Sequence, residues 1–375
     1  MSVSDTREII VGHLLTGEIY AVLPAHAGPW SMVHRKAGKI SASVLVTPDL
    51  LNQYPDLPVQ VKEWRSFIGV RIPESRRILN AGPITNWSFD SETSILEITG
   101  AGLPAYFEHR YLVQAGRIPD PMVSLDWTKL SLGSIAGRVV TQTMAHPGGN
   151  LPIVIPPDVA GTNERHYKGY DMGQVWERLT QLMEVQNGPD LMFQPRMKDE
   201  SHIEWQMRIG DPLLSQDGDA WRLPIGNGRS SVLGYSVASD GADMAYRVFT
   251  VGSGTNEEAL IAQAADYSMI DEYGFPLLER KETYSSVTEM NTLNSWANAN
   301  VGANKAPWKT WKFKLDPTAT PRLGDYRPGD WVVTQIDQRF PFLPLGEFRG
   351  RIMTVSGDLT GLVTVELTPT VDGRQ

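Results

Sequence analysis

The sequence predicts a β-rich fold with a smaller α+β region in its middle, and three observations support this class. Short β-branched runs bounded by Gly or Pro recur along the chain, as strands do. The 34 Gly and 26 Pro are spread over the 375 residues, which favours many turns over long helices. Apolar residues at helical spacing gather between about residues 127 and 211.

The first region reads as a series of strands separated by turns. The expected strands are 9–11, 18–23, 39–46, 67–72, 82–89 and 94–100. In the third, Ile40, Ala42 and Val44 alternate with serines, which is typical of a sheet with one buried side. The polar link 90–93 has the length of a hairpin loop. We therefore expect an antiparallel barrel or sandwich, as a first domain at 1–120.

The middle region mixes helices and strands. Helices are expected at 134–144 and 171–183, the second with Asp171 as its N-cap and a stop at 187–189. Strands are expected at 191–196 and 202–209, and the Pro-rich stretch 151–161 is expected to form a long loop. These elements predict an α+β domain at 125–211.

Strands return in the last region, which we expect to form a second β-rich domain at 212–375. The expected strands are 231–238, 245–251, 308–315, 330–337, 350–356 and 362–367. One inserted helix is expected at 257–265, because strong helix formers follow acidic residues there.

Composition excludes several classes of protein. The net charge of -9 argues against nonspecific binding to nucleic acid or an anionic membrane. The absence of cysteine excludes disulfides, thiolate metal sites and cysteine nucleophiles. No leader precedes the first strand, and no apolar run reaches the ~18 residues of a membrane span, so we expect synthesis in a cytoplasm and no membrane insertion.

The pattern Gly-Ser-Gly-Thr-Asn-Glu at 252–257 is the sharpest local motif, because it follows a strand and precedes the expected helix. In a dinucleotide site the third glycine would stand where Glu257 is, and the charge of Glu257 would oppose a pyrophosphate. Thr255 with Glu258 fits a capping box instead. We therefore expect no cofactor at this loop.

Metal binding is not expected either. The seven histidines never pair at the i, i+4 spacing of a helical zinc site. They are His13, His26, His34, His109, His146, His166 and His202. We expect His166, beside charged and polar neighbours, to lie in a solvated polar loop.

No Gly-x-Ser-x-Gly elbow and no Walker loop is present, so the commonest hydrolase and NTPase signatures are missing. Glycosidases need only two carboxylates from distant segments and carry no universal motif. The loop carboxylates that could serve are Asp199, Glu200, Asp217, Asp219, Asp271 and Glu272. Most acidic side chains are simply solvated, and we predict no catalytic residues and no enzymatic activity.

The 11 tryptophans allow a second reading, because aromatic faces can stack on sugars. Those inside strand patterns are expected in the core or as anchors between subunits: Trp87, Trp205, Trp311 and Trp331. Trp30 and Trp296 are expected to be exposed, and sugar contact would be sought there.

Several segments resemble the minor tail proteins of siphophages that infect actinobacteria, which belong with the hub proteins at the distal end of the tail tube. The segments are GHLLTG at 12–17, GPITNWSFD at 82–90, GAGLPAYFEHR at 100–110, LGDYRPGDWVV at 323–333 and GRI at 350–352. Independently of the family, Pro328, Gly329 and Asp330 predict a tight turn before a strand.

The resemblance implies two tail-tube-like β-barrel domains with an inserted smaller α+β domain. It also implies that three copies close a ring beneath the tube, so that two barrels per chain match its six-fold end. Closed rings use heterologous interfaces and remove exposed strand edges. Some related hubs continue into fibre, receptor-binding or wall-degrading modules, whereas this chain stops at Gln375. A role as scaffold and adaptor is therefore expected.

The function implied by the resemblance is that of a structural hub in a phage tail tip or baseplate. It would join the tail tube or distal tail protein to the tip and gate DNA release during host attachment and genome ejection. The expected partners are copies of itself as a homotrimer, the distal tail protein, the tail tube, the tape measure protein and other minor tail proteins, with DNA passing only transiently. One alternative is a wall-directed carbohydrate-binding protein or glycosidase, and another is a receptor-binding tip protein.

Overall fold

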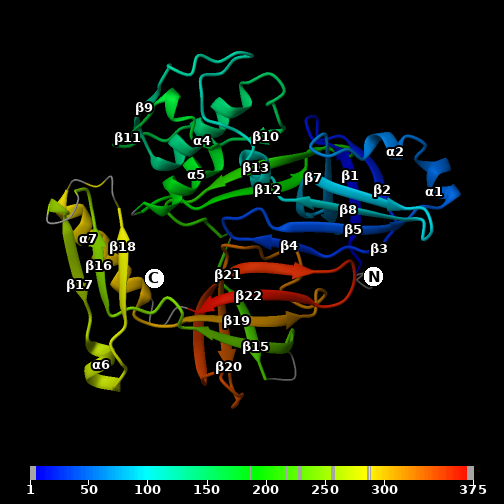
Figure 1. Ribbon diagram of the computed structural model, residues 1–375. Helices are drawn as coiled ribbons and strands as arrows, with labels where there is room; N and C mark the ends of the chain where they lie inside the picture. Colours follow the sequence, from blue (N-terminus) through cyan, green and yellow to red (C-terminus); the bar gives the residue numbers. More distant parts are fainter. Residues whose placement is uncertain are drawn as a thin grey trace. The chain divides into compact units, whose positions relative to one another are not determined.

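The structure is a computed structural model that describes residues 6–369 except 186, 217, 227–229, 255–257, 285–286 and 288 (Figure 1). The chain divides into two compact units. Unit 1 comprises Met1–Tyr235 and Lys312–Gln375, and unit 2 comprises Ser236–Trp311, inserted between them in sequence. The boundaries predicted from the sequence, at 1–120, 125–211 and 212–375, stay predictions.

The first group of strands in unit 1 lies in the order β4-β5-β8-β7-β6-β1-β2, with β3 paired to β5. Its members are β1 (Glu8–His13), β2 (Ile19–Leu23), β3 (Ala25–Ala27), β4 (Trp30–Val33), β5 (Lys39–Leu45), β6 (Ser66–Arg71), β7 (Ile78–Asp90) and β8 (Ile95–Ala101). Two short helices connect β5 to β6, namely α1 (Pro48–Gln53) and α2 (Leu57–Gln60). All six strands expected in this region are confirmed.

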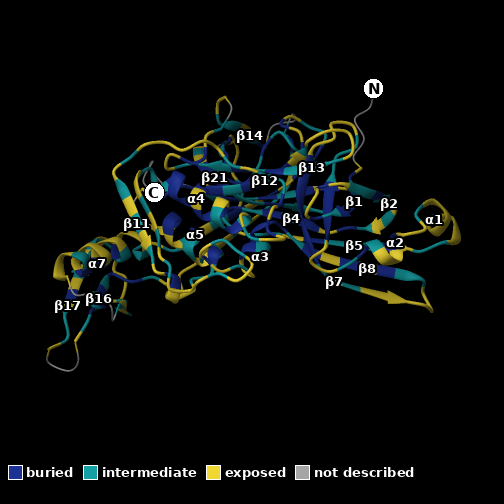
Figure 2. Ribbon diagram, turned by 90° about the horizontal axis from the view of Figure 1, so that it is seen from above, coloured by how far each residue is buried: buried dark blue, intermediate teal, exposed yellow. Residues whose placement is uncertain are grey.

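Side-chain alternation on β5 decides which face of this sheet is buried. Ile40, Ala42 and Val44 are fully buried, and the register pairs Ala42 with Ile98 and Val44 with Leu96 of β8. The predicted alternation is therefore confirmed. The last residues of β7 pair with β8 but are exposed, so this hairpin extends beyond the core (Figure 2).

A second group of strands, most of it in unit 1, joins the first through one long strand. Its members are β14 (Trp221–Ile225), β15 (Val232–Asp240), β19 (Trp308–Leu315), β20 (Trp331–Ile336), β21 (Gly346–Gly357) and β22 (Val363–Pro369). One edge of β21 pairs first with β20 and then with β4, so the two groups form a single 14-stranded sheet. The β-rich class is confirmed, and the pairings between described strands close no barrel.

The α+β segment of unit 1 has two helices where the sequence predicts them. Its strands are β9 (Leu125–Leu130), β10 (Ile153–Val154), β11 (Asn163–Tyr167), β12 (Leu191–Met197) and β13 (Ile203–Ile209). Its helices are α3 (Pro104–Phe107), α4 (Leu132–Met144), η1 (Gly169–Asp171) and α5 (Val175–Glu184). The expected cap at Asp171 is wrong, because the chain makes a 3-10 turn there and Met172 adopts φ 41° before α5 begins.

One hydrophobic cluster holds the α+β segment against the first group of strands. Trp205 of β13 is fully buried, and its indole N–H donates to the Ala81 carbonyl of β7 at 3.0 Å. Its ring meets Phe67 of β6 edge-on, with centroids 6.1 Å apart. Phe107 of α3 packs on Phe193 of β12 at 4.9 Å. The helices thus cover the apolar face that an isolated sheet would expose.

Unit 2 is a three-stranded sheet with one helix on it (Figure 1). Strand β16 (Arg247–Val251) lies between β17 (Ile261–Ala265), which is antiparallel to it, and β18 (Glu279–Thr283), which is parallel. Helix α7 (Met290–Asn304) packs on β16 and β17 through its three buried residues, Leu293, Ala297 and Val301. A short helix, α6 (Ser268–Tyr273), buries no residue.

The helix expected at 257–265 is wrong. Its described C-terminal part is strand β17, in which exposed Ile261 and Gln263 flank buried Ala262, as in a strand with one covered face. Pairing with β16 on one edge overrides the helix propensity of the alanines. Helix α7 was not predicted, because its stripe of three buried residues is narrow and the rest of the helix is rich in Asn.

Candidate functional site

Asp199 is one of the loop carboxylates that could serve a glycosidase. Asp199 holds a turn, accepting hydrogen bonds from the backbone N–H groups of Ser201 and His202, both at 2.8 Å. These bonds and the His202 side chain lower the pKa of Asp199 to about 2. A carboxyl that stays ionised to such low pH cannot act as the general acid of a glycosidase.

The remaining candidates are distributed over both units. Asp271 and Glu272 are on α6 in unit 2, Asp219 is in an exposed loop of unit 1, and Glu200 is beside Asp199. Asp217 lies outside the described residues. None of the five described carboxylates lines either of the two cavities described below. The geometry therefore gives no support to hydrolysis of a glycosidic bond.

The histidines and the glycine loop at 252–257 are the sequence features that bear on metal or cofactor binding. Over the described part of the chain, no three His, Asp or Glu side chains gather as metal ligands. His166 is exposed, but it lies on β11, not in a loop, and contacts Asp126 at 2.8 Å. Residues 255–257 lie outside the described part, and Gly252 and Ser253 belong to a connection between antiparallel strands. A dinucleotide fingerprint needs a helix after this loop.

The tryptophans depart from the prediction at Trp30, and Trp87 and Trp331, expected in the core or as anchors between subunits, are only partly buried. Trp205 and Trp311 are buried as expected, and Trp296 is 38% exposed as expected. Trp30 of β4, expected to be exposed, is buried in the large sheet. Its indole N–H donates to the Asp358 carbonyl at 3.1 Å. Trp296 stands edge-on to Tyr284, with ring centroids 4.3 Å apart.

A buried charge cluster in unit 1 is centred on Asp190, a residue that the sequence did not single out. Its side chain is fully buried. Arg351 of β21 donates to it at 2.6 Å, and Arg35, after β4, donates from Nε at 2.8 Å. His34 Nε2 lies 3.4 Å away, and the backbone N–H of Leu214 donates at 3.2 Å.

These neighbours decide the protonation state of Asp190. Burial alone would raise the pKa of this carboxyl, but His34 and Arg351 hold the pKa well below its usual range. The carboxylate is therefore charged at neutral pH and fully partnered. The cluster, named here the Asp190 network, ties together the turn after β4, the start of β12 and the strand β21.

A cavity of about 200 Å³ in unit 1 is also lined by charged groups that are paired. Arg77 forms an ion pair with Asp325 at 2.7 Å. Asp330 accepts from the Trp221 indole at 3.2 Å and from the Arg327 backbone N–H at 3.1 Å. The last bond, with Gly329 at φ +91°, confirms the predicted turn before β20. We therefore interpret this cavity as a structural feature and not as a ligand site.

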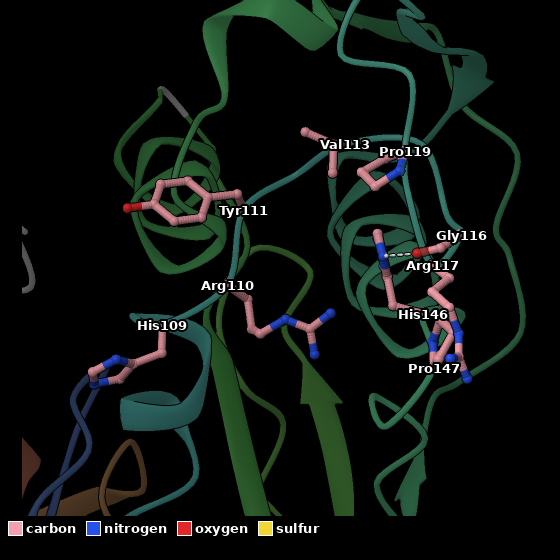
Figure 3. Close-up of a pocket in the computed structure, with 9 residues that line it drawn as sticks. All are labelled: His109, Arg110, Tyr111, Val113, Gly116, Arg117, Pro119, His146 and Pro147. Carbon is pink, nitrogen blue, oxygen red and sulfur yellow. Dashed lines mark hydrogen bonds between the residues drawn. The ribbon is translucent and has the colours of Figure 1, made fainter.

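A larger cavity, about 340 Å³ in volume, opens beside α3 and the C-terminal end of α4 (Figure 3). It is named here the basic pocket, and it is lined by His109, Arg110, Tyr111, Val113, Gly116, Arg117, Pro119, His146 and Pro147. The lining contains two arginines and two histidines and no acidic residue. In Figure 3 the Arg110 side chain extends toward the side where His146 and Arg117 lie, and Tyr111 points to the opposite side.

Neutral groups hold Arg110 in place. Its guanidinium donates to the Tyr106 hydroxyl and to the Thr143 carbonyl, the second at 3.2 Å. His146 Nδ1 donates to the Gly116 carbonyl at 3.2 Å, while its Nε2 is buried and has no hydrogen-bond partner among the described residues. Within the described chain, neither Arg110 nor Arg117 has an ion-pair partner. The pocket is a positively charged concavity in which Arg110 is held in place, and no sequence motif signalled it.

Several exposed apolar side chains of unit 1 lie in loops. Ile118 and Met122, in the segment between α3 and β9, are 92% and 70% exposed. Phe342, between β20 and β21, is 88% exposed at φ 63°. No helix in the described part of the chain is both long enough and apolar enough to cross a membrane.

Comparison with known proteins identifies the fold. No protein-family model matches the chain, and no curated protein matches it by sequence. Among solved structures, the 43 kDa tail protein of prophage MuSo2 from Shewanella oneidensis aligns with a TM-score of 0.61 at 10% identity, covering 97% of this chain and 98% of that one. A tail protein from Neisseria meningitidis MC58 aligns with 0.60 at 13% identity, covering 98% and 96%.

A third structure extends the likeness to another bacterial host. The prophage tail protein gp18 from Listeria monocytogenes EGD-e aligns with a TM-score of 0.50 at 11% identity, covering 98% of this chain and 95% of that one. The chain therefore has the fold of phage tail proteins. The resemblance to tail-tip proteins noted in the sequence is confirmed at the level of the fold.

Proposed function

We propose that this chain is a structural hub protein of a phage tail tip. The observation that carries the proposal is the extent of the fold likeness. Tail proteins from two different bacteria align with nearly all of this chain, and this chain with nearly all of theirs. A fold shared over almost the whole of each chain supports a shared structural role.

The hub is proposed to form a ring of three chains. In each chain, the group of strands from β1 to β8 and the group from β14 to β22 would act as two tube-like domains, giving six around the ring. The large sheet of unit 1 supports this, because its described path ends at two edges, β2 and β15. Open sheet edges are normally paired or protected, and neighbouring chains would complete the two barrels.

The proposed place of the ring, beneath the tail tube, defines its expected partners. The ring would contact the tail tube or distal tail protein on one side, and the tape measure protein and other minor tail proteins around the tip. DNA would pass only during ejection, when the ring opens. The protein would be made in the host cytoplasm and reside in the virion. The proposed role needs buried interface area, on the order of thousands of Å² for obligate subunits, and no catalysis.

Native mass spectrometry of the purified chain, alone and mixed with the distal tail protein of the same phage, tests the proposal. We expect trimers, or a trimer that forms with the partner. A monomer at every concentration that also binds no tail protein would contradict the hub. Incubation with host cell wall checks the alternative, because release of sugar that is lost in Asp199→Asn or Asp271→Asn would favour a glycosidase.

A further inference from the structure

We propose that the basic pocket binds a carboxylate on an acidic segment of a protein partner, and that the apolar loop beside it packs against the same partner. This inference concerns a surface of unit 1 and stands whether or not the chain is a tail-tip hub. The segment 111–124, which follows α3, supplies part of the pocket wall and also carries the exposed apolar residues.

The first argument is that the cations of the pocket lack a counter-charge. Elsewhere in unit 1, Arg77, Arg138 and Arg196 each form an ion pair with a carboxylate of the chain. Arg110 and Arg117 form none within the described residues, although they line one cavity together. A cation that lines a cavity without an anion from the described chain attracts an external carboxylate, which would lower the electrostatic free energy of the site.

The second argument is preorganisation. Hydrogen bonds to the Tyr106 hydroxyl and the Thr143 carbonyl occupy two of the five N–H donors of Arg110 and fix the guanidinium plane. Free N–H groups on a fixed guanidinium suit a carboxylate, which accepts two parallel hydrogen bonds. A ligand would therefore bind without the entropy loss of first ordering this side chain.

The third argument separates a protein partner from a nucleic acid. The pocket has room for one or two side chains, at about 340 Å³. Beside it, Tyr111, Ile118 and Met122 expose apolar surface, and aromatic and Met side chains together with Arg are enriched where proteins meet. The net charge of -9 opposes a long polyanion such as DNA. An acidic loop that carries an apolar neighbour fits both halves of the surface.

Calorimetric titration of the full chain with the peptide acetyl-Asp-Glu-Tyr-amide tests the proposal. We expect saturable binding with a Kd of about 1 mM or below, and at least ~10-fold weaker binding of acetyl-Asn-Gln-Tyr-amide, because the charge-assisted bonds are lost. Arg117→Gln should weaken binding of the acidic peptide by about 10-fold. Arg117 is exposed, so this variant should fold normally.

Arg222→Gln is the matched control. It removes the same charge from an exposed arginine of β14, outside the pocket lining, and should leave peptide binding unchanged. Arg110→Gln gives a second, internal test and should also weaken binding. Equal binding by wild type and Arg117→Gln, or no saturable binding up to about 5 mM peptide, would overturn the proposal. So would single-stranded DNA that binds at the same site more tightly than the peptide.

A second experiment identifies which molecule supplies the carboxylate. Light scattering compares self-association of wild type with that of Arg117→Gln. Weaker self-association in the variant identifies a second copy of this chain as the donor. Unchanged self-association, combined with lost peptide binding, identifies a different protein.

Discussion

Two clusters of arginine and histidine in unit 1 use the same residue types for opposite purposes. In the Asp190 network, Arg35, Arg351 and His34 surround one fully buried carboxylate of the same chain. In the basic pocket, two arginines and two histidines line an open cavity without any carboxylate. The first cluster is complete within the chain, and the second has its positive charge available to a ligand.

The difference follows from burial. A charge removed from water is tolerated only when it is paired and hydrogen-bonded, so the Asp190 network has to be satisfied internally for unit 1 to fold. A charge at an open cavity stays hydrated and can remain unpaired until a partner arrives. Removing a member of the first cluster should therefore reduce stability, whereas removing one from the second should affect binding alone.

The largest effect is expected from Asp190→Ala. The substitution leaves Arg351 buried without its carboxylate, and we expect the free energy of unfolding to fall by about 3–5 kcal/mol. Urea denaturation followed by circular dichroism measures it. Asp325→Ala, which breaks the more exposed ion pair with Arg77, serves as the control and should cost no more than ~1 kcal/mol. Equal losses for the two variants would contradict the distinction.

A smaller loss is expected from Arg351→Gln, at about 2–3 kcal/mol by the same measurement. Arg351 also donates to the Gly329 carbonyl at 3.1 Å, so its removal affects the turn before β20 as well as Asp190. Arg35→Gln should cost less, because the Arg35 side chain is 36% exposed and that of Arg351 only 7%. The reverse ranking of the two arginines would show that burial does not set the strength of the network.

The pH dependence of stability should come next in size. The folded-state pKa of Asp190 lies below its unfolded value of about 3.9, so its stabilisation is complete above that value and declines as the pH falls through it toward the folded pKa. The difference in unfolding free energy between wild type and Asp190→Asn should shrink by about 1 kcal/mol between pH 6 and pH 3. A constant difference over this range would mean that the Asp190 pKa is not lowered.

The smallest effect is expected at the basic pocket. Arg117→Gln should change the free energy of unfolding by less than about 0.5 kcal/mol, because the side chain is exposed and has no ion-pair partner among the described residues. Thermal unfolding at two ionic strengths checks it. A loss above ~1 kcal/mol would show that this arginine supports the fold, and would remove the contrast between the two clusters.

The strands could be predicted because their signal is local. Alternation in β5 and the polar link 90–93 each depend on residues a few positions apart, and both are found in the structure. The prediction of a helix at 257–265 was wrong because pairing with β16 decided the conformation of this segment. The prediction that Trp30 is exposed was wrong because its partner, Asp358, lies 328 residues away in the sequence.

The Asp190 network and the basic pocket could not be predicted from the sequence, because each brings together residues that lie far apart in the chain. Asp190 meets Arg35 across 155 residues and Arg351 across 161, and only the folded sheet brings them together. The basic pocket combines residues 109–119 with 146–147, which share no motif. The fold class followed from local pattern, whereas these sites depend on long-range pairing of strands and helices.

The most direct test of the proposed hub is a cryo-EM map of the tail tip of the phage particle that contains this protein. We expect three copies in a closed ring at the distal end of the tail tube. In each chain, strands β1 to β8 would form one tube-like domain, and strands β14, β15 and β19 to β22 a second, which gives six around the ring. A particle whose tip lacks the chain, or carries it as separate copies that never contact one another, would contradict that role.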